Sequence, residues 1–154
     1  MKSLKWCKKH KMKIIQPNHN LAEEYYKNAE ETLRITNLIK NANSNMWLAT
    51  QKYYALYLAA YSILMKIGIK TEIHECTIAI IRFLEKEKLL DFNFSLLLEK
   101  DKQVRIENQY YLKNREVEYD SKEMSVILLN IRRLLDELNS DTIQEVRSIL
   151  KDIN

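Results

Sequence analysis

The fold is decided by the stretch from Trp47 to Gly68, WLATQKYYALYLAAYSILMKIG. Tyr53, Tyr57 and Tyr61 recur in it at four-residue steps, which predicts one face of an α-helix. Apolar side chains continue around most of the other faces, so we expect this helix to be packed on most sides. Its longest uncharged run has 13 residues, which is too short to cross a bilayer. Gly68, the only glycine of the chain, predicts a left-handed cap at its end.

The composition favours an all-α fold. One glycine and one proline among 154 residues leave few residues suited to tight turns, and the Walker and Rossmann fingerprints are absent. The length fits a single domain that buries a real core. No secretory signal is visible, so we expect a cytoplasmic protein.

The periodic pattern predicts an up-and-down helical bundle of four to five main helices. The expected helices cover about residues 21–42, 47–68, 72–88, 94–114 and 120–138, followed by a short one from 141. Asn20 and Asp120 are the predicted caps of two of them. In this scheme residues 1–19 form a basic N-terminal arm, and residues 20–154 form one helical domain.

The N-terminal arm is strongly basic. Residues 1–13 hold six lysines and no acid, although the net charge of the whole chain is only +4. Trp6 within this stretch suggests that the arm docks on something. One interpretation is a solvated or loosely packed terminus, and the other is an arm that contacts the phosphates of a nucleic acid. The lysines that would make such contacts are Lys8, Lys9 and Lys11.

The two cysteines, Cys7 and Cys76, are interpreted as ordinary buried thiols. Two alternatives remain open. One is a zinc site completed by His10 and His74, and the other is a disulfide, which intracellular proteins of hyperthermophiles tolerate. On the favoured interpretation we expect no metal ion and no cofactor.

The helix expected over residues 94–114 contains an internal conflict. Leu97, Val104 and Tyr111 recur at seven-residue steps, but Asp101 and Asn108 lie on the same stripe. Polar residues on a stripe that should be buried often mark a functional site.

Arg105 lies on the same expected helix, within the segment RIENQYY. A guanidinium binds phosphate bidentately, and neighbouring amides and phenols add hydrogen-bond donors. The candidate partners are Asn108, Gln109, Tyr110 and Tyr111. The alternative is an ion pair between Arg105 and Asp101 across one helical turn.

Several short segments of the chain resemble the HEPN family, and more narrowly archaeal HEPN-domain proteins. They are Lys5-Trp6-Cys7, the stretch from Pro17 to Tyr25, the stretch GIKTEIHECT from Gly68 to Thr77, and RIENQYY on a later helix. The resemblance covers nearly the whole chain. It implies a helical bundle of four to five helices that forms a homodimer.

The resemblance also implies a function. Many HEPN proteins are metal-independent ribonucleases whose motif is an Arg followed, after a short spacer, by a His at a dimer cleft. Arg105 matches the Arg, but Tyr110 occupies the position of the His. Tyr has a pKa of about 10 against about 6.5 for His, and is therefore a poor proton shuttle at neutral pH.

We therefore predict an HEPN protein that binds RNA or a nucleotide. The resemblance implies that it is the partner of a minimal nucleotidyltransferase in a toxin–antitoxin pair, with Tyr110 or Tyr111 as the plausible site of modification. One alternative is an active ribonuclease that uses Arg105 with Tyr110 or another group. The other alternative is a structural helical dimer or adaptor.

Overall fold

The computed structural model describes all of residues 1–154, and 71% of the chain is helical. The elements are α1 (Leu4–His10), β1 (Met12–Ile14), α2 (His19–Ile39), α3 (Asn45–Ile67), β2 (Ile69–Thr71), α4 (His74–Lys86), α5 (Phe94–Gln109), α6 (Ser121–Glu137) and α7 (Ser140–Asp152). The helical prediction is confirmed for most of the chain, but two short strands and a helix near the N-terminus were not predicted. No helix combines the length and the apolar composition that a membrane crossing requires.

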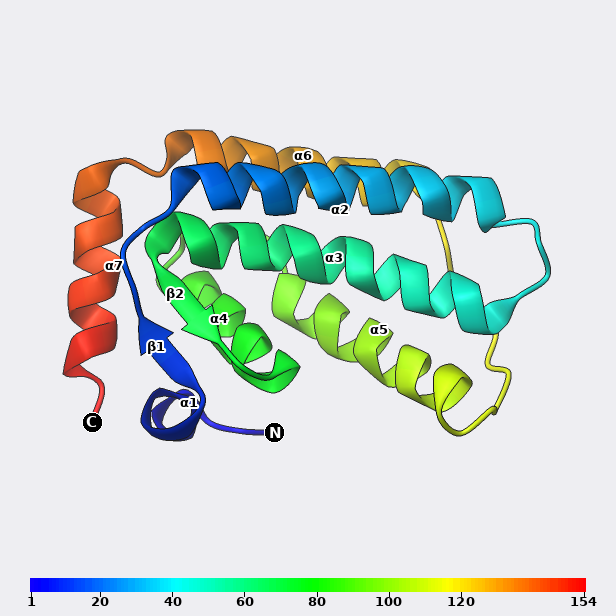
Figure 1. Ribbon diagram of the computed structural model, residues 1–154, viewed down its shortest axis with the longest axis horizontal. Coiled ribbons are helices and arrows are strands. Elements are labelled where there is room, and N and C mark those ends of the chain that lie inside the picture. Colours follow the sequence, from blue (N-terminus) through cyan, green and yellow to red (C-terminus); the bar gives the residue numbers. More distant parts are fainter.

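Helix α3 is the centre of the fold, because every other long helix contacts it. Helices α2 and α6 lie along one side of α3, and α4 and α5 lie along the other (Figure 1). Its side chains Tyr53, Leu56, Ile63 and Leu64 have no exposed surface. Each contributes about 1.5–3 kcal/mol when fully buried. The apolar residues on most faces of this segment therefore match packing on most faces of the helix.

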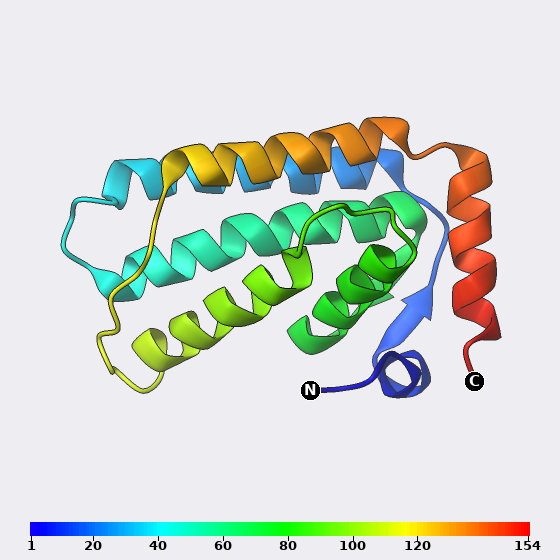
Figure 2. The same cartoon turned by 180° about the vertical axis from the view of Figure 1, so that it is seen from behind.

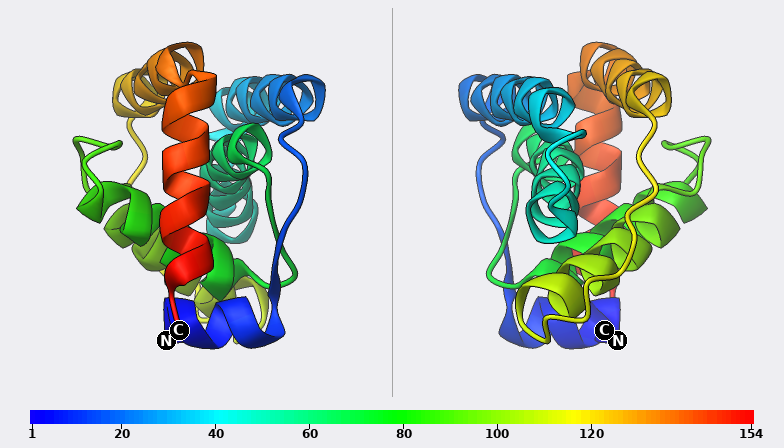
Figure 3. Two further views of the ribbon diagram at one scale, coloured as in Figure 1. Left: turned by 90° about the vertical axis from the view of Figure 1, so that its left-hand side faces the viewer. Right: turned by 90° about the vertical axis from the view of Figure 1, so that its right-hand side faces the viewer.

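Helices α2 and α3 run antiparallel and side by side, and α7 lies across the end of the bundle. Seen from behind, α6 runs beside α2, while α4 and α5 lie on the opposite side of α3 (Figure 2). Views along the long axis show α7 standing across the end of the bundle (Figure 3). Short connections between antiparallel neighbours are typical of helical bundles.

Residues 1–15 are packed onto the bundle. β1 pairs antiparallel with β2, and Met12 lies opposite Thr71. Beyond the strands, the Ile15 amide donates a hydrogen bond of 2.8 Å to the Gly68 carbonyl. This stretch is therefore not loosely packed, although four of its six lysine side chains are exposed to solvent, as the interpretation of a solvated terminus expected. Three-residue strands give no periodic signal, and their pairing partner lies far along the chain.

A disulfide joins Cys7 on α1 to Cys76 on α4, with the two Cα atoms 5.5 Å apart. The prediction of two free buried thiols is therefore wrong. The zinc alternative with His10 and His74 also fails, because both sulfur atoms are bonded to each other. The strands explain the pairing: β1 follows α1 and β2 precedes α4, so the sheet brings the two helices together. Disulfides are rare in reducing compartments outside hyperthermophiles, and the cytoplasmic location stays a prediction.

The ends of the helices follow the sequence signals in part. Gly68 ends α3 with a φ of 86°, as predicted. Asp120 caps α6, also as predicted, and its carboxylate accepts from two backbone amides. The cap of α2 is Asn18, two residues before the predicted one. Helix α5 ends at Gln109, well before the predicted end near residue 114.

Candidate functional site

Three polar residues of α5 are buried. Asp101, Arg105 and Asn108 are 5%, 7% and 3% exposed, and they share their side of the helix with the fully buried Leu98. The burial of the polar residues Asp101 and Asn108 is thus confirmed, whereas Leu97 and Val104 of the predicted stripe are only partly buried. Tyr111, expected on the same stripe, lies beyond the end of the helix and is exposed instead. Buried polar groups are costly unless they are paired, so the partners of these three side chains matter.

Asp101 is paired with Lys52 of α3 and not with Arg105. Lys52 Nζ donates to Asp101 Oδ1 at 3.2 Å and to the Glu118 carbonyl at 2.7 Å. The other carboxylate oxygen, Asp101 Oδ2, has no partner. Burial raises the pKa of Asp101, although the charge of Lys52 opposes this shift. The alternative in which Arg105 pairs with Asp101 is therefore wrong.

Arg105 lies among aromatic rings and has no carboxylate partner. Its Cζ atom is 5.0, 5.4 and 5.8 Å from the ring centres of Tyr53, Tyr54 and Tyr110. Nη1 donates to the Tyr54 hydroxyl at 3.4 Å and to Gln109 Oε1 at 3.2 Å. Nε is buried without a partner, whereas Nη2, which also has no hydrogen bond, is not sealed from solvent. The rings attract the guanidinium, but no anion neutralises its charge.

Asn108 holds the turn that follows α5. Its Nδ2 atom donates to the carbonyls of Asn45 at 3.3 Å and Arg115 at 2.9 Å. Its Oδ1 atom accepts from the Arg115 amide at 2.6 Å. These bonds stabilise the turn after Gln109. The amide of Asn108 is therefore engaged by the backbone, and this predicted binding residue positions the turn.

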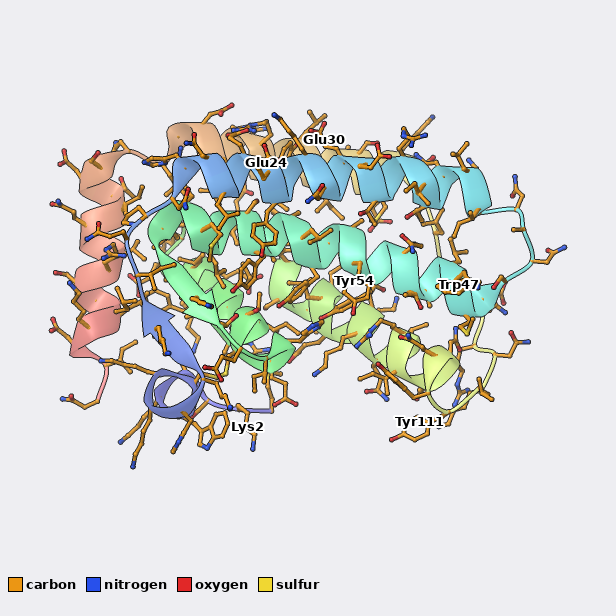
Figure 4. The ribbon with its side chains drawn as sticks, viewed as in Figure 1. Lys2, Glu24, Glu30, Trp47, Tyr54 and Tyr111 are labelled. Carbon is orange, nitrogen blue, oxygen red and sulfur yellow. A yellow bond between two sulfur atoms is a disulfide. The ribbon has the colours of Figure 1, made fainter.

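Four large apolar side chains, which together we name the end patch, are exposed where α5 ends and α3 begins. The end patch consists of Trp47, Tyr110, Tyr111 and Leu112, which are 53%, 64%, 67% and 75% exposed. Figure 4 shows Trp47 and Tyr111 at the same end of the molecule, on α3 and just after α5. Exposed apolar patches mark sites of interaction. Both tyrosines predicted as modification sites are accessible here.

The structure also brings a histidine close to the tyrosines that surround Arg105. His74, the first residue of α4, stacks on Tyr57 with ring centres 4.1 Å apart. Its Nδ1 atom shares a hydrogen bond of 2.8 Å with the Tyr53 hydroxyl, and its ring lies edge-on to Tyr54. Tyr53 and Tyr54 therefore contact both His74 and Arg105. No spacing in the sequence predicts this meeting of α4 and α5 over α3, and the only signal was the tyrosine repeat.

The burial of His74 predicts a pH dependence of stability. Desolvation first, and then the charges of Arg105 and Lys102, lower the pKa of His74 from 6.5 to about 4. Between these values the unfolded chain binds a proton that the folded protein does not, so stability should rise with pH from about 4 to about 6.5. We expect a gain on the order of 1–2 kcal/mol, because the partly exposed ring is screened by solvent.

Thermal unfolding measured across this pH range checks the prediction. In a His74→Gln variant, stability should rise less steeply with pH than in wild type, because the histidine no longer contributes. The buried Asp101 has a raised pKa and so lowers stability as pH rises, and this contribution is present in both proteins. Equal slopes for the two proteins would contradict the prediction.

The lysines predicted to bind RNA lie elsewhere. They are Lys8, Lys9 and Lys11. Lys8 Nζ donates to the Ile153 carbonyl at 2.6 Å, Lys11 pairs with Glu72 at 3.0 Å, and Lys9 is exposed. Helix α1 and the C-terminal end of α5 lie towards opposite ends of the long axis (Figure 1). The structure therefore does not bring these lysines together with Arg105.

Comparison with known proteins gives no relative: no family model, no curated protein and no solved structure matches the chain. No group of three or more His, Cys, Asp or Glu side chains lies close enough together to hold a metal ion.

Proposed function

We propose that this chain is an HEPN-like protein that binds a phosphate group of RNA or of a nucleotide at Arg105. One observation carries the proposal. Arg105 is a nearly buried guanidinium without a carboxylate partner, and it lies beside a patch of exposed aromatic side chains. Guanidinium groups bind phosphate through two parallel hydrogen bonds.

The charge of Arg105 favours an anion. Burying an unpaired charge costs several kcal/mol, whereas contact with aromatic rings offsets only about 2 kcal/mol. The carboxylate one turn before it, Asp101, is already paired with Lys52. Nη2 has no hydrogen bond, and the exposed ring of Tyr110 lies near the guanidinium. Nη2 is therefore the atom at which a phosphate oxygen would bind.

The end patch supports a ligand that carries bases. Exposed aromatic rings stack on nucleobases, and such stacking is worth about 1–3 kcal/mol per base in single-stranded RNA complexes. Tyr110, Tyr111 and Trp47 all offer such rings close to the end of α5. A phosphate on Arg105 and a base on one of these rings would together select a nucleotide over a simple anion.

The resemblance to HEPN proteins agrees with this arrangement. Residues five apart on a regular helix point away from each other, yet the Arg105 guanidinium lies 5.8 Å from the Tyr110 ring. The pair meets because the arginine side chain is long and Tyr110 is the C-terminal cap residue of α5. We include in the proposal a homodimer and a nucleotidyltransferase partner, for which Tyr110 and Tyr111 would be accessible acceptors.

Replacing Arg105 tests the proposed binding site. Arg105→Ala should weaken the binding of a labelled single-stranded oligoribonucleotide at least about tenfold, because a hydrogen bond to a charged group contributes about 1.5–3 kcal/mol. Fluorescence anisotropy at low salt measures the affinity, and unlabelled ATP added as a competitor tests a free nucleotide. Circular dichroism shows whether the variant is folded.

Arg34→Ala is the matched control. Arg34 is an exposed arginine of α2 that already pairs with Glu31, so its removal should change the affinity less than about twofold. Failure of the folded wild type to bind RNA or ATP would contradict the proposal, as would equal losses for Arg105→Ala and Arg34→Ala.

A metal-independent ribonuclease is the second candidate, and His74 favours it. Tyr110 is a poor proton acceptor at neutral pH. His74 is an unprotonated imidazole at that pH, and the lowering of its pKa to about 4 makes it a weaker base than a free imidazole. His74 shares Tyr53 and Tyr54 with Arg105. RNA cleavage in the presence of a chelator, lost in both Arg105→Ala and His74→Gln, would establish this activity. Binding without cleavage would leave the chain as a binding subunit.

A further inference from the structure

A cleft lies between α7 and the segment that leads into α2, and its volume is about 470 Å³. Its polar lining includes Gln16, His19, Gln144, Arg147, Ser148 and Lys151. None of the residues that line it is acidic. Helix α7 stands at the end of the bundle away from the end patch (Figures 1 and 3). The cleft is therefore separate from the site around Arg105.

Arg147 is fixed at the wall of this cleft by the backbone. Its Nη1 atom donates to the carbonyls of Ile15 at 2.6 Å, Ile67 at 3.0 Å and Gly68 at 3.0 Å. Its Nε and Nη2 atoms make no hydrogen bond, and neither is sealed from solvent. No carboxylate pairs with this guanidinium. It is a positioned cation whose remaining N–H groups are free to bind an oxyanion.

The remaining charge of the cleft is also positive. Lys151 follows Arg147 by one helical turn, lines the same cleft and makes no ion pair. The acidic residues of α7 are not among the residues that line the cleft. The two cations therefore act on the cleft without a counter-charge from its walls.

We propose that this cleft binds the phosphate group of a small phosphorylated molecule. Arg147 offers two nitrogen atoms, Lys151 an ammonium group, and Gln144 and Ser148 further donors. A carboxylate has only two oxygen atoms to accept hydrogen bonds, so this set of donors matches better a phosphate group, which has three or four. The volume falls in the range of clefts that hold ligands of nucleotide size, which is about 300–1,000 Å³.

Isothermal titration calorimetry with inorganic phosphate and with ADP tests the site. Lys151→Glu should weaken the binding of either ligand at least about tenfold, because it removes one cation and adds a repelling charge. Lys122→Ala removes an exposed lysine of α6 and should leave the affinity within about twofold. Arg147 is not the residue to replace, because its loss would also remove three hydrogen bonds to the backbone.

The two ligands separate the sources of the phosphate. Tighter binding of ADP than of phosphate, weakened by Lys151→Glu, would support a nucleotide, and equal binding of the two would support a site for the phosphate group alone. No heat from either ligand at about 10 mM, or equal affinity in wild type and Lys151→Glu, would overturn the proposal. The Arg105→Ala variant should bind phosphate and ADP in this cleft as tightly as wild type does. The cleft can therefore be tested even if no RNA binds at Arg105.

Discussion

Removing the disulfide should lower the free energy of unfolding by about 4 kcal/mol, as expected for a cross-link that closes a long loop. Cys7 and Cys76 are 69 residues apart in the sequence. Their bond removes much conformational freedom from the unfolded chain and holds α1 against α4 in the folded one. The change to make is the double variant Cys7→Ala/Cys76→Ala, and the measurement is urea unfolding followed by circular dichroism.

Reduced wild-type protein is the matched control, because it keeps both sulfur atoms and loses only the bond. Both samples should lose a similar amount of stability, with any further loss in the double variant coming from the two deleted sulfur atoms. A loss below about 1 kcal/mol in both samples would show that the cross-link does not constrain the unfolded chain as proposed.

Gly68→Ala should destabilise the protein by about 3 kcal/mol, from the left-handed backbone conformation and from overlap together. The φ of Gly68 is 86°, and a Cβ atom there would overlap the Ile15 carbonyl and Arg147 Nη1. These are the groups that tie β1 and α7 to the end of α3. Urea unfolding of the variant measures the effect.

A double-mutant cycle with Arg147→Ala separates the two causes. Removing the arginine relieves its part of the overlap, so the two substitutions together should cost less than the sum of their separate effects. If Gly68→Ala alone lowered the free energy of unfolding by less than about 1 kcal/mol, the Ile15 carbonyl and Arg147 would not pack as closely against Gly68 as described.

The sequence predicted the helices well where their faces are strongly patterned. In α3 apolar residues on most faces gave its length and its central position, and Gly68 gave its end. The sheet was missed because β1 and β2 have three residues each and pair across more than fifty intervening residues. The disulfide depends on that pairing, so Cys7 and Cys76 could not be matched without it.

The candidate site was predicted in part. The segment around Arg105 was recognised, and its polar neighbours are buried as the pattern indicated. The partner of Asp101 was predicted wrongly, because Lys52 reaches it from α3 and no local spacing shows that pairing. His74 was missed for the same reason. Local patterns gave the helix faces, while the contacts between helices depend on how those faces pack.

The salt dependence of RNA binding tests the central claim most directly. The claim is that Arg105 holds a phosphate of the ligand. If so, the slope of the logarithm of affinity against the logarithm of salt concentration should be shallower in Arg105→Ala by about 0.7, the value expected when one phosphate of a single strand is no longer neutralised by the protein. Wild type, Arg105→Ala and Arg34→Ala would be compared between about 50 and 200 mM salt. An unchanged slope in Arg105→Ala, with wild-type affinity, would contradict the account.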